Sequence, residues 1–406
     1  MARLDGIVGL VAIVCCAYLF STARGAIQKR VLLWGITLQF AFAFLVLKTK
    51  LGELFYGISL LVNALLNYTV AGSSFVFGDK LGARTEQFGV IFAFQILPIV
   101  IFICSLFAIL YYLGIMQVFV KGMAIVMQRF MGTSGAESTC VAASIVMGQT
   151  EAPVTIRPFL ESLTESELFT VMTSGMAHVS GSVMAAYVAI AGVSIAHLLT
   201  AVIMTAPATI MLAKMFVPET GQPLTLGTVK VGVEKPGVNV IDAAARGAGD
   251  GLNLALNIAG MVIAFLALVA MINGGLGWLH SHIAWIPGTL QQILALLFAP
   301  VAWALGVSWN DCATIGNLLG TRMVLNEFVA FLDLGKVKAL LQPRSFVIGT
   351  FALCGFANLS SIAIQIGGIG ALAPSRKSDL ARLGLKAMFV GTLANFMSAC
   401  IAGLLL

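Results

Sequence analysis

The chain is poor in charged side chains. Only 10% of its 406 residues are Asp, Glu, Lys or Arg, whereas soluble domains carry about 25%. Six segments contain no charged residue: 31–47, 87–120, 168–213, 251–310, 345–375 and 387–406. Because a membrane-spanning helix needs roughly 20 apolar residues, several of these segments have room for more than one span. The scarcity of charge excludes an ordinary water-soluble protein and predicts an all-α polytopic membrane protein.

Several motifs of pumps and soluble enzymes are also missing. The sequence has no GxxxxGK phosphate loop, no HExxH and no GxSxG, so ATP-driven transport and the common hydrolytic mechanisms have no support. Its seven cysteines form no CxxC pair and are expected to be buried thiols, not disulfides or metal ligands. The net charge of +6 comes from bases scattered through short loops, which does not predict a nucleic-acid partner. No cofactor is expected.

Basic residues indicate which loops face the cytoplasm. Lys and Arg gather in the connections near residues 24–30, 121–129, 214–246 and 376–386, and cytoplasmic loops are enriched in these residues. This assignment makes both termini external. The first apolar run is preceded by Asp5 and followed by no clean cleavage site, so we expect an uncleaved first span and not a signal peptide.

These patterns predict eight spans and two re-entrant hairpins of opposite orientation. Residues 1–130 are expected to hold spans at 6–22, 31–47 and 90–114, with interfacial helices between and after them. Residues 131–245 form a first repeat, with a hairpin at 134–162, a broken span at 168–190, a span at 196–213 and a cytoplasmic loop. Residues 246–406 form an inverted second repeat, with a span at 254–273 ended by a bend at Gly274-Gly275, a hairpin at 288–331, a broken span at 346–368 and a last span at 387–405.

Two acidic motifs in these hairpins are conspicuous because acids are costly inside a membrane. Glu151 lies in the segment Gln149–Pro153, and Glu327 lies in an Asn-Glu-Phe sequence. Each is followed by a Gly-apolar-Ala-polar-apolar-Ser sequence, at 175–180 and 355–360, a constant offset of 180 residues. Polar breaks in duplicated apolar segments are typical of transporters whose substrate site lies between inverted repeats. We therefore predict one binding site built from both repeats.

The two acidic tips offer hydrogen-bonding groups that suit a polar, uncharged ligand. Pro153 ends the helix near Glu151 and leaves backbone carbonyls free, although the tip could also satisfy its polar groups internally. The Glu327 carboxylate can accept two hydroxyl hydrogens at once, which suits a vicinal diol such as the edge of a ribose. A structural ion pair between Arg322 and Glu327 is the alternative.

The two broken spans add further candidate groups. Asn358 and Ser361 are three residues apart, hence on one helix face, and Phe356 offers an aromatic plane beside them. An amide, a hydroxyl and a ring together predict a site for a sugar and a base. His178 occupies the repeat position of Asn358. It is either a histidine that serves only packing or a group beside Glu151 that couples cation binding to substrate loading.

Several ordered motifs resemble those of the concentrative nucleoside transporters. They are GQTEAP at 148–153, RPF at 157–159, GSV at 181–183, PET at 218–220, NEFVA at 326–330 and CGFANLSS at 354–361. The resemblance covers nearly the whole chain. It implies a homotrimer in the lipid bilayer of the bacterial inner membrane that imports nucleosides, such as uridine, by symport with a cation. It also implies an elevator mechanism, in which the hairpins and broken spans carry the substrate past a fixed scaffold.

The same resemblance implies the residues that contact the nucleoside. Those facing the base would be Gln149, Thr150 and Glu151. Those holding the ribose would be Glu327, Asn358 and Ser361, and those forming the walls would be Val183, Leu254 and Phe356.

The family's sodium site corresponds to four positions here. They are Ser144, Met147, His178 and Val179. Serine stands where sodium-coupled members have asparagine, and histidine stands where they have a hydroxyl residue. Sodium prefers oxygen ligands and an imidazole offers only nitrogen, while proton-coupled members carry serine at the first position. Na⁺ is the default coupling ion of the family, and H⁺ is the alternative.

Two other functional classes remain open from the residues alone. A membrane-embedded enzyme could use Glu151 and Glu327 as acid and base, but it would not require inverted copies of a hairpin. A passive nucleoside channel would line a continuous path with polar groups, whereas here they gather at two tips.

Overall fold

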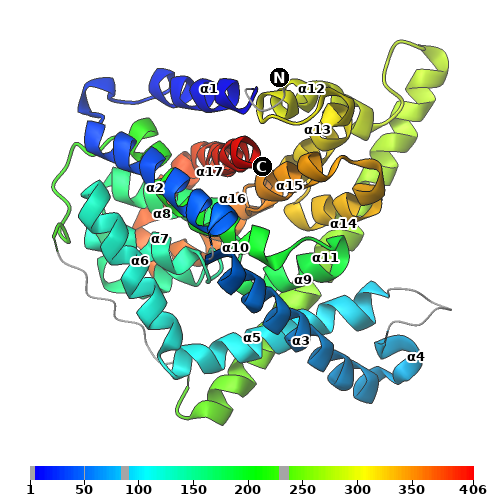
Figure 1. The fold of residues 1–406 in the computed structure, drawn as a ribbon, viewed down its shortest axis with the longest axis horizontal. Coiled ribbons are helices and arrows are strands. Elements are labelled where there is room, and N and C mark those ends of the chain that lie inside the picture. Colours follow the sequence, from blue (N-terminus) through cyan, green and yellow to red (C-terminus); the bar gives the residue numbers. More distant parts are fainter. Residues whose placement is uncertain (1–4, 50, 84–90, 228–236) are drawn as a thin grey trace.

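The computed structural model describes residues 5–49, 51–83, 91–227 and 237–406. Over these ranges the chain is helical, without strands (Figure 1). The elements are α1 (Asp5–Leu19), α2 (Lys29–Lys48), α3 (Leu51–Phe77), α4 (Asp79–Gly82), η2 (Phe92–Ile96), α5 (Leu97–Tyr112), α6 (Ile115–Met131), α7 (Gly135–Ser144), η3 (Ala152–Ser162), α8 (Glu165–Ala177), α9 (Gly181–Ala191), α10 (Ile195–Phe216), α11 (Val240–His282), α12 (Leu290–Ala304), α13 (Trp309–Val324), α14 (Glu327–Val337), α15 (Pro343–Leu353), α16 (Leu359–Leu372) and α17 (Lys377–Leu405), with short helical turns between some of them.

The helices of the described ranges agree with a chain that crosses the membrane many times. Six are long and apolar enough to do so, and one of these is the broken pair α8–α9. The 15-residue α1 is shorter than the roughly 20 residues of a full span, and α15–α16 is divided by residues 354–358. These two elements and the six long helices lie where the eight spans are predicted.

One prediction about a single helix differs from the structure. The bend at Gly274-Gly275 is wrong, because α11 continues unbroken through both glycines to His282. Glycine weakens a helix by only about 1 kcal/mol, and neither position has an atom nearby that would force a turn. The interfacial helix expected within 51–86 corresponds to α3, of 27 residues; among the described residues it is not one of the helices long and apolar enough to span, and only its part Ala64–Phe77 is apolar.

The second hairpin also lies later in the chain than predicted. The range 288–331 contains α12 and α13, which meet at 118°, and the acidic tip falls between α13 and α14. The hairpin therefore runs from Trp309 to Val337, and α12 is a separate helix against it. Gly306, with φ at +91°, makes the sharp turn between α12 and α13. The first hairpin consists of α7 and the 3-10 helix η3, joined by a tip at residues 145–151.

The two hairpins begin at opposite ends of α17. Near its first residues, Arg376 donates to the carbonyl of Leu163 at 2.7 Å, at the base of the first hairpin. Near its last residues, the carbonyl of Gly403 accepts from Arg344, which also donates to Gly306 before the second hairpin. Figure 1 shows α17 near the centre of the view, with α7 and α8 on one side and α13–α15 on the other. The hairpin tips thus approach each other from opposite sides.

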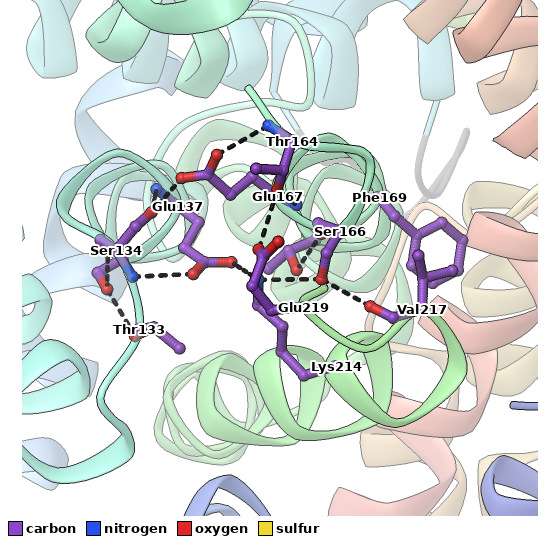
Figure 2. Close-up of polar contacts among 12 residues, drawn as sticks. Thr133, Ser134, Glu137, Thr164, Ser166, Glu167, Phe169, Lys214, Val217 and Glu219 are labelled. Atoms are coloured by element: carbon purple, nitrogen blue, oxygen red, sulfur yellow. Dashed lines mark hydrogen bonds and ion pairs between the residues drawn. The ribbon is translucent and has the colours of Figure 1, made fainter. Parts of the chain in front are cut away.

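A buried polar cluster joins the base of the first hairpin to α8 (Figure 2). Ser134 and Glu137 form a capping box at the start of α7, and Thr164 and Glu167 form another at the start of α8. The hydroxyl of Ser134 also donates to Glu167, at 2.5 Å, so the two boxes are linked. Such caps satisfy backbone N–H groups that a helix start leaves unpaired.

Lys214, at the end of α10, supplies the positive charge of this cluster. Its ammonium lies 2.8 Å from Glu137 and 3.1 Å from Glu219, and it donates to Ser166 at 3.0 Å. The side chains of Lys214 and Glu137 are only 8% and 1% exposed. The cluster therefore fixes the hairpin base to α8 and α10 through buried ion pairs.

Candidate functional site

One cavity of about 460 Å³ lies between the two hairpin tips and the two broken spans. All nine residues implied to contact the nucleoside line it: Gln149, Thr150, Glu151, Val183, Leu254, Glu327, Phe356, Asn358 and Ser361. They come from both repeats and from α11. The cavity is large enough for a small polar molecule, and Glu151 and Glu327, which are 176 residues apart in the sequence, both border it.

Two protein donors fix the Glu327 carboxylate. Tyr187 of α9 donates to one oxygen at 3.1 Å, and the amide of Asn358 donates to the other at 2.8 Å. Glu327 is 6% exposed and is the first residue of α14, where the helix dipole favours a negative charge. A carboxylate offers about four acceptor positions, so about two remain for a ligand in the cavity.

The tip of the first hairpin is attached to the second repeat. Gln149 donates to the hydroxyl of Ser361 at 3.2 Å and accepts from Gln365 at 3.4 Å, both on α16. Thr150 packs against Gly368, where a Cβ atom would lie 2.6 Å from the threonine methyl group. Gly368 therefore serves close packing and not a bend, and α16 holds the tip in place.

The glycines that begin the duplicated sequence have equivalent packing roles. A Cβ on Gly175 would lie 2.5 Å from the amide nitrogen of Gln365, and one on Gly355 would lie 2.2 Å from the amide oxygen of Asn395. At both breaks an amide side chain occupies the space that any larger residue would need. The 180-residue repeat is thus reproduced in packing as well as in sequence.

Arg322 does not pair with Glu327, so the alternative of a structural ion pair is wrong. Its guanidinium donates to the carbonyls of Ala352 and Gly355, at 2.6 and 3.1 Å, and to the side chain of Asn395. Its carbonyl partners belong to the broken end of α15, where backbone groups lack helical partners. Arg322 is 0% exposed, and its role is to stabilise the break that carries Asn358.

Asn395 of α17 connects the two breaks. Its amide donates to the carbonyl of Ala177, at the end of α8, at 2.7 Å and to the carbonyl of Cys354, after α15, at 2.8 Å. The backbone N–H of Phe356 also donates to the carbonyl of His178, at 3.3 Å. The breaks of both repeats therefore meet directly and share one side chain.

The four predicted cation-site residues surround the first break without forming a set of free oxygen ligands. Ser144 donates to the carbonyl of Cys140 at 2.9 Å, and the His178 ring contacts the carbonyl of Ser174 at 2.9 Å. Val179 is buried at 0% exposure, and Met147 is partly buried. Glu151, expected beside His178, accepts a hydrogen bond from the backbone N–H of Gly148 at 3.1 Å.

Several further residues line the cavity without having been assigned a ligand contact from the sequence, although Asn326 and Phe328 flank Glu327 in its acidic motif. These further residues are Gly148, Ser180, Asn257, Ile258, Met261, Asn326, Phe328, Ser360 and Ile364. Tyr187 was also missed as the partner of Glu327. A tyrosine in an otherwise uncharged span was the only available signal, since its hydroxyl needs a partner when buried.

Comparison with known proteins places this fold and site in a family. The family models match over most of the chain: "Na+ dependent nucleoside transporter N-terminus" at residues 8–80, "Nucleoside recognition" at 93–194 and "Na+ dependent nucleoside transporter C-terminus" at 197–403. The chain belongs to the Na⁺ dependent nucleoside transporter family. It is therefore a multi-pass membrane transport protein and not an enzyme.

Individual relatives agree with this assignment. The uncharacterized transporter YutK of Bacillus subtilis is 43% identical, with 100% of both chains covered. Solute carrier family 28 member 3 of Rattus norvegicus is 41% identical over 98% of this chain, which spans 58% of that relative's length. The structure of CNTnw in an inward-facing substrate-bound state is 41% identical with a TM-score of 0.93, covering 100% of this chain and 98% of the other. A CNTnw variant in an intermediate state has a TM-score of 0.94.

Proposed function

We propose that this protein imports nucleosides such as uridine by symport with a cation. The arrangement around Glu327 supports this most directly. Tyr187 and Asn358 hold the carboxylate and leave about two acceptor positions free, which matches the two adjacent hydroxyls of a ribose. Gln149, Thr150 and Glu151 lie at the other tip of the same cavity, where they would meet the base.

An elevator mechanism is proposed for the transport step. Asn395 joins both breaks, and Gln149 and Ser361 join the first tip to α16, so these elements would move as one body. Such a body could carry its cavity past the remaining helices without opening the site. We propose a homotrimer in the bacterial inner membrane with both termini external; the clustered bases of the connecting loops and the bacterial relatives support this placement.

The coupling ion is proposed to be Na⁺, with H⁺ as the competing possibility. The family description supports sodium. Two observations keep H⁺ as the alternative coupling ion. Ser144 and His178 are each already bonded to a backbone carbonyl, and an imidazole offers only nitrogen as a ligand.

Uridine uptake into proteoliposomes tests these proposals. We expect concentration against a gradient when Na⁺ is high outside, and we expect a Na⁺-free, acid-outside gradient to give much slower uptake. Faster uptake in the acid gradient would reverse the choice of ion. Equilibration without accumulation under either gradient would indicate a passive channel and contradict symport.

A further inference from the structure

A second, smaller cavity lies beside the nucleoside cavity, and we propose that it binds a small inorganic cation with part of its water shell. This side chamber has a volume of about 180 Å³. Its walls are α5, the first hairpin tip, the start of α9 and α11, and they include Tyr111, Glu151, Ser182 and Asp250. Glu151 and Ser180 border both cavities, so one carboxylate faces the substrate cavity and the chamber together.

The side chamber carries negative charge without a basic counterpart. Glu151 and Asp250 line it, and its lining contains no Lys, Arg or His. Within the described part of the chain, Glu151 has the Gly148 N–H as its hydrogen-bond partner, and Asp250 is exposed with no ion pair. The nearby Arg246 is bonded to Asp242 instead. Two carboxylates facing one chamber repel each other unless a cation lies between them.

Tyr111 gives an independent indication of a ligand. This residue is only 9% exposed, and its hydroxyl has no hydrogen-bond partner among the described residues. Leaving a buried hydroxyl unpaired costs about 1–3 kcal/mol. A hydrated cation in the side chamber would supply the missing partner, either directly or through one of its waters.

The donor chemistry indicates which cations fit. Carboxylate and hydroxyl oxygens are the ligands that hard cations such as Na⁺ and Ca²⁺ prefer. The described residues contain no group of three or more His, Cys, Asp and Glu side chains suited to a metal, so a tightly held transition metal does not fit. At about 30 Å³ for each water, the chamber has room for an ion that keeps several waters.

This site differs from the set predicted from the sequence. Only Met147 of the four predicted residues borders the side chamber, and none of the four carries a carboxylate. The new site also joins different parts of the fold, because Asp250 and Tyr111 belong to α11 and α5 whereas Glu151 belongs to a hairpin tip. If the hairpin moves, which rests on the proposed function, the cation would favour the state in which these elements meet.

Cation-induced thermal stabilisation of the purified, nucleoside-free protein tests the proposal. NaCl and CaCl₂ are compared with N-methyl-D-glucamine chloride at equal ionic strength. We expect Na⁺ or Ca²⁺ to raise the melting temperature of the unmodified protein. Asp250→Asn should need about tenfold more cation or more for the same shift, since it removes one of two charged ligands. Tyr111→Phe, which keeps the ring, should weaken the shift less.

Matched variants separate this site from the alternatives. Asp242→Asn removes an acid from the same helix that is paired with Arg246, and it should keep the full cation response. The proposal is overturned if neither cation stabilises the unmodified protein, or if Asp250→Asn responds normally, or if Ser144→Ala alone abolishes the shift. Uridine binding by the unmodified protein in N-methyl-D-glucamine is measured separately, so a failure of the proposed function would be distinguishable.

Discussion

Replacing Glu327 with glutamine is expected to weaken uridine binding at least tenfold. The substitution keeps the size of the side chain but removes the charge that strengthens hydrogen bonds to ribose hydroxyls, each worth about 1.5–3 kcal/mol. The glutamine also has one acceptor oxygen in place of two, while Tyr187 and Asn358 both donate to the native carboxylate. Titration calorimetry with uridine measures the change directly.

A control on the same helix keeps this test specific. Asp333→Asn alters a partly exposed acid that is paired with Lys336, and it should leave uridine affinity unchanged. Binding of the free base uracil should change little in Glu327→Gln, because the ribose contact is absent. Unchanged uridine affinity in Glu327→Gln would remove the ribose assignment.

Replacing Lys214 with alanine is expected to lower the free energy of unfolding by about 3–5 kcal/mol, the usual effect of removing one partner from a buried ion pair. Glu137 and Glu219 would lose the ammonium that both of them contact, and the linked caps of α7 and α8 would be left with uncompensated negative charge. Thermal unfolding in detergent, followed by the loss of monodisperse protein, measures the change.

Two further variants test whether charge is the cause. Lys336→Ala removes a lysine whose side chain is 65% exposed, and an exposed pair of this kind contributes less than about 1 kcal/mol. In a Lys214→Met background, Glu137→Gln with Glu219→Gln should recover much of the lost stability, because the uncompensated carboxylates are gone. If the triple variant is less stable than Lys214→Met alone, buried charge does not explain the cluster.

The sequence predicts the polar tips and breaks well because each interrupts an apolar segment. Glu151 and Glu327 are visible as acids where a membrane disfavours them, and the Gly-apolar-Ala-polar-apolar-Ser repeat marks both broken spans. The eight span positions follow from length and hydrophobicity. The roles of the wall residues came from family resemblance, since an apolar residue such as Val183 carries no chemical signal of its own.

Other features depend on partners that sequence does not reveal. From the sequence, Glu327 is the nearest acid with which Arg322 could form an ion pair. In the structure, Arg322 instead donates to backbone carbonyls at the end of α15 and to a side-chain amide of α17. Every residue has a backbone carbonyl, so the position of a helix break determines which carbonyls lack a helical hydrogen-bond partner. The range predicted for the second hairpin begins too early, at residue 288, because the apolar residues before the hairpin form the separate helix α12, which ends at Ala304.

The position of Asn395 has a consequence for biosynthesis. Membrane helices are made and inserted from the N-terminal end, and α17 follows every other helix of the fold. Until it arrives, the carbonyls of Ala177 and Cys354 lack the amide that pairs with both, and unpaired backbone groups are poorly tolerated in lipid. The two halves of the repeat therefore cannot reach their final packing one after the other as the ribosome releases them. We therefore expect the two breaks to close against each other only after α17 has been inserted.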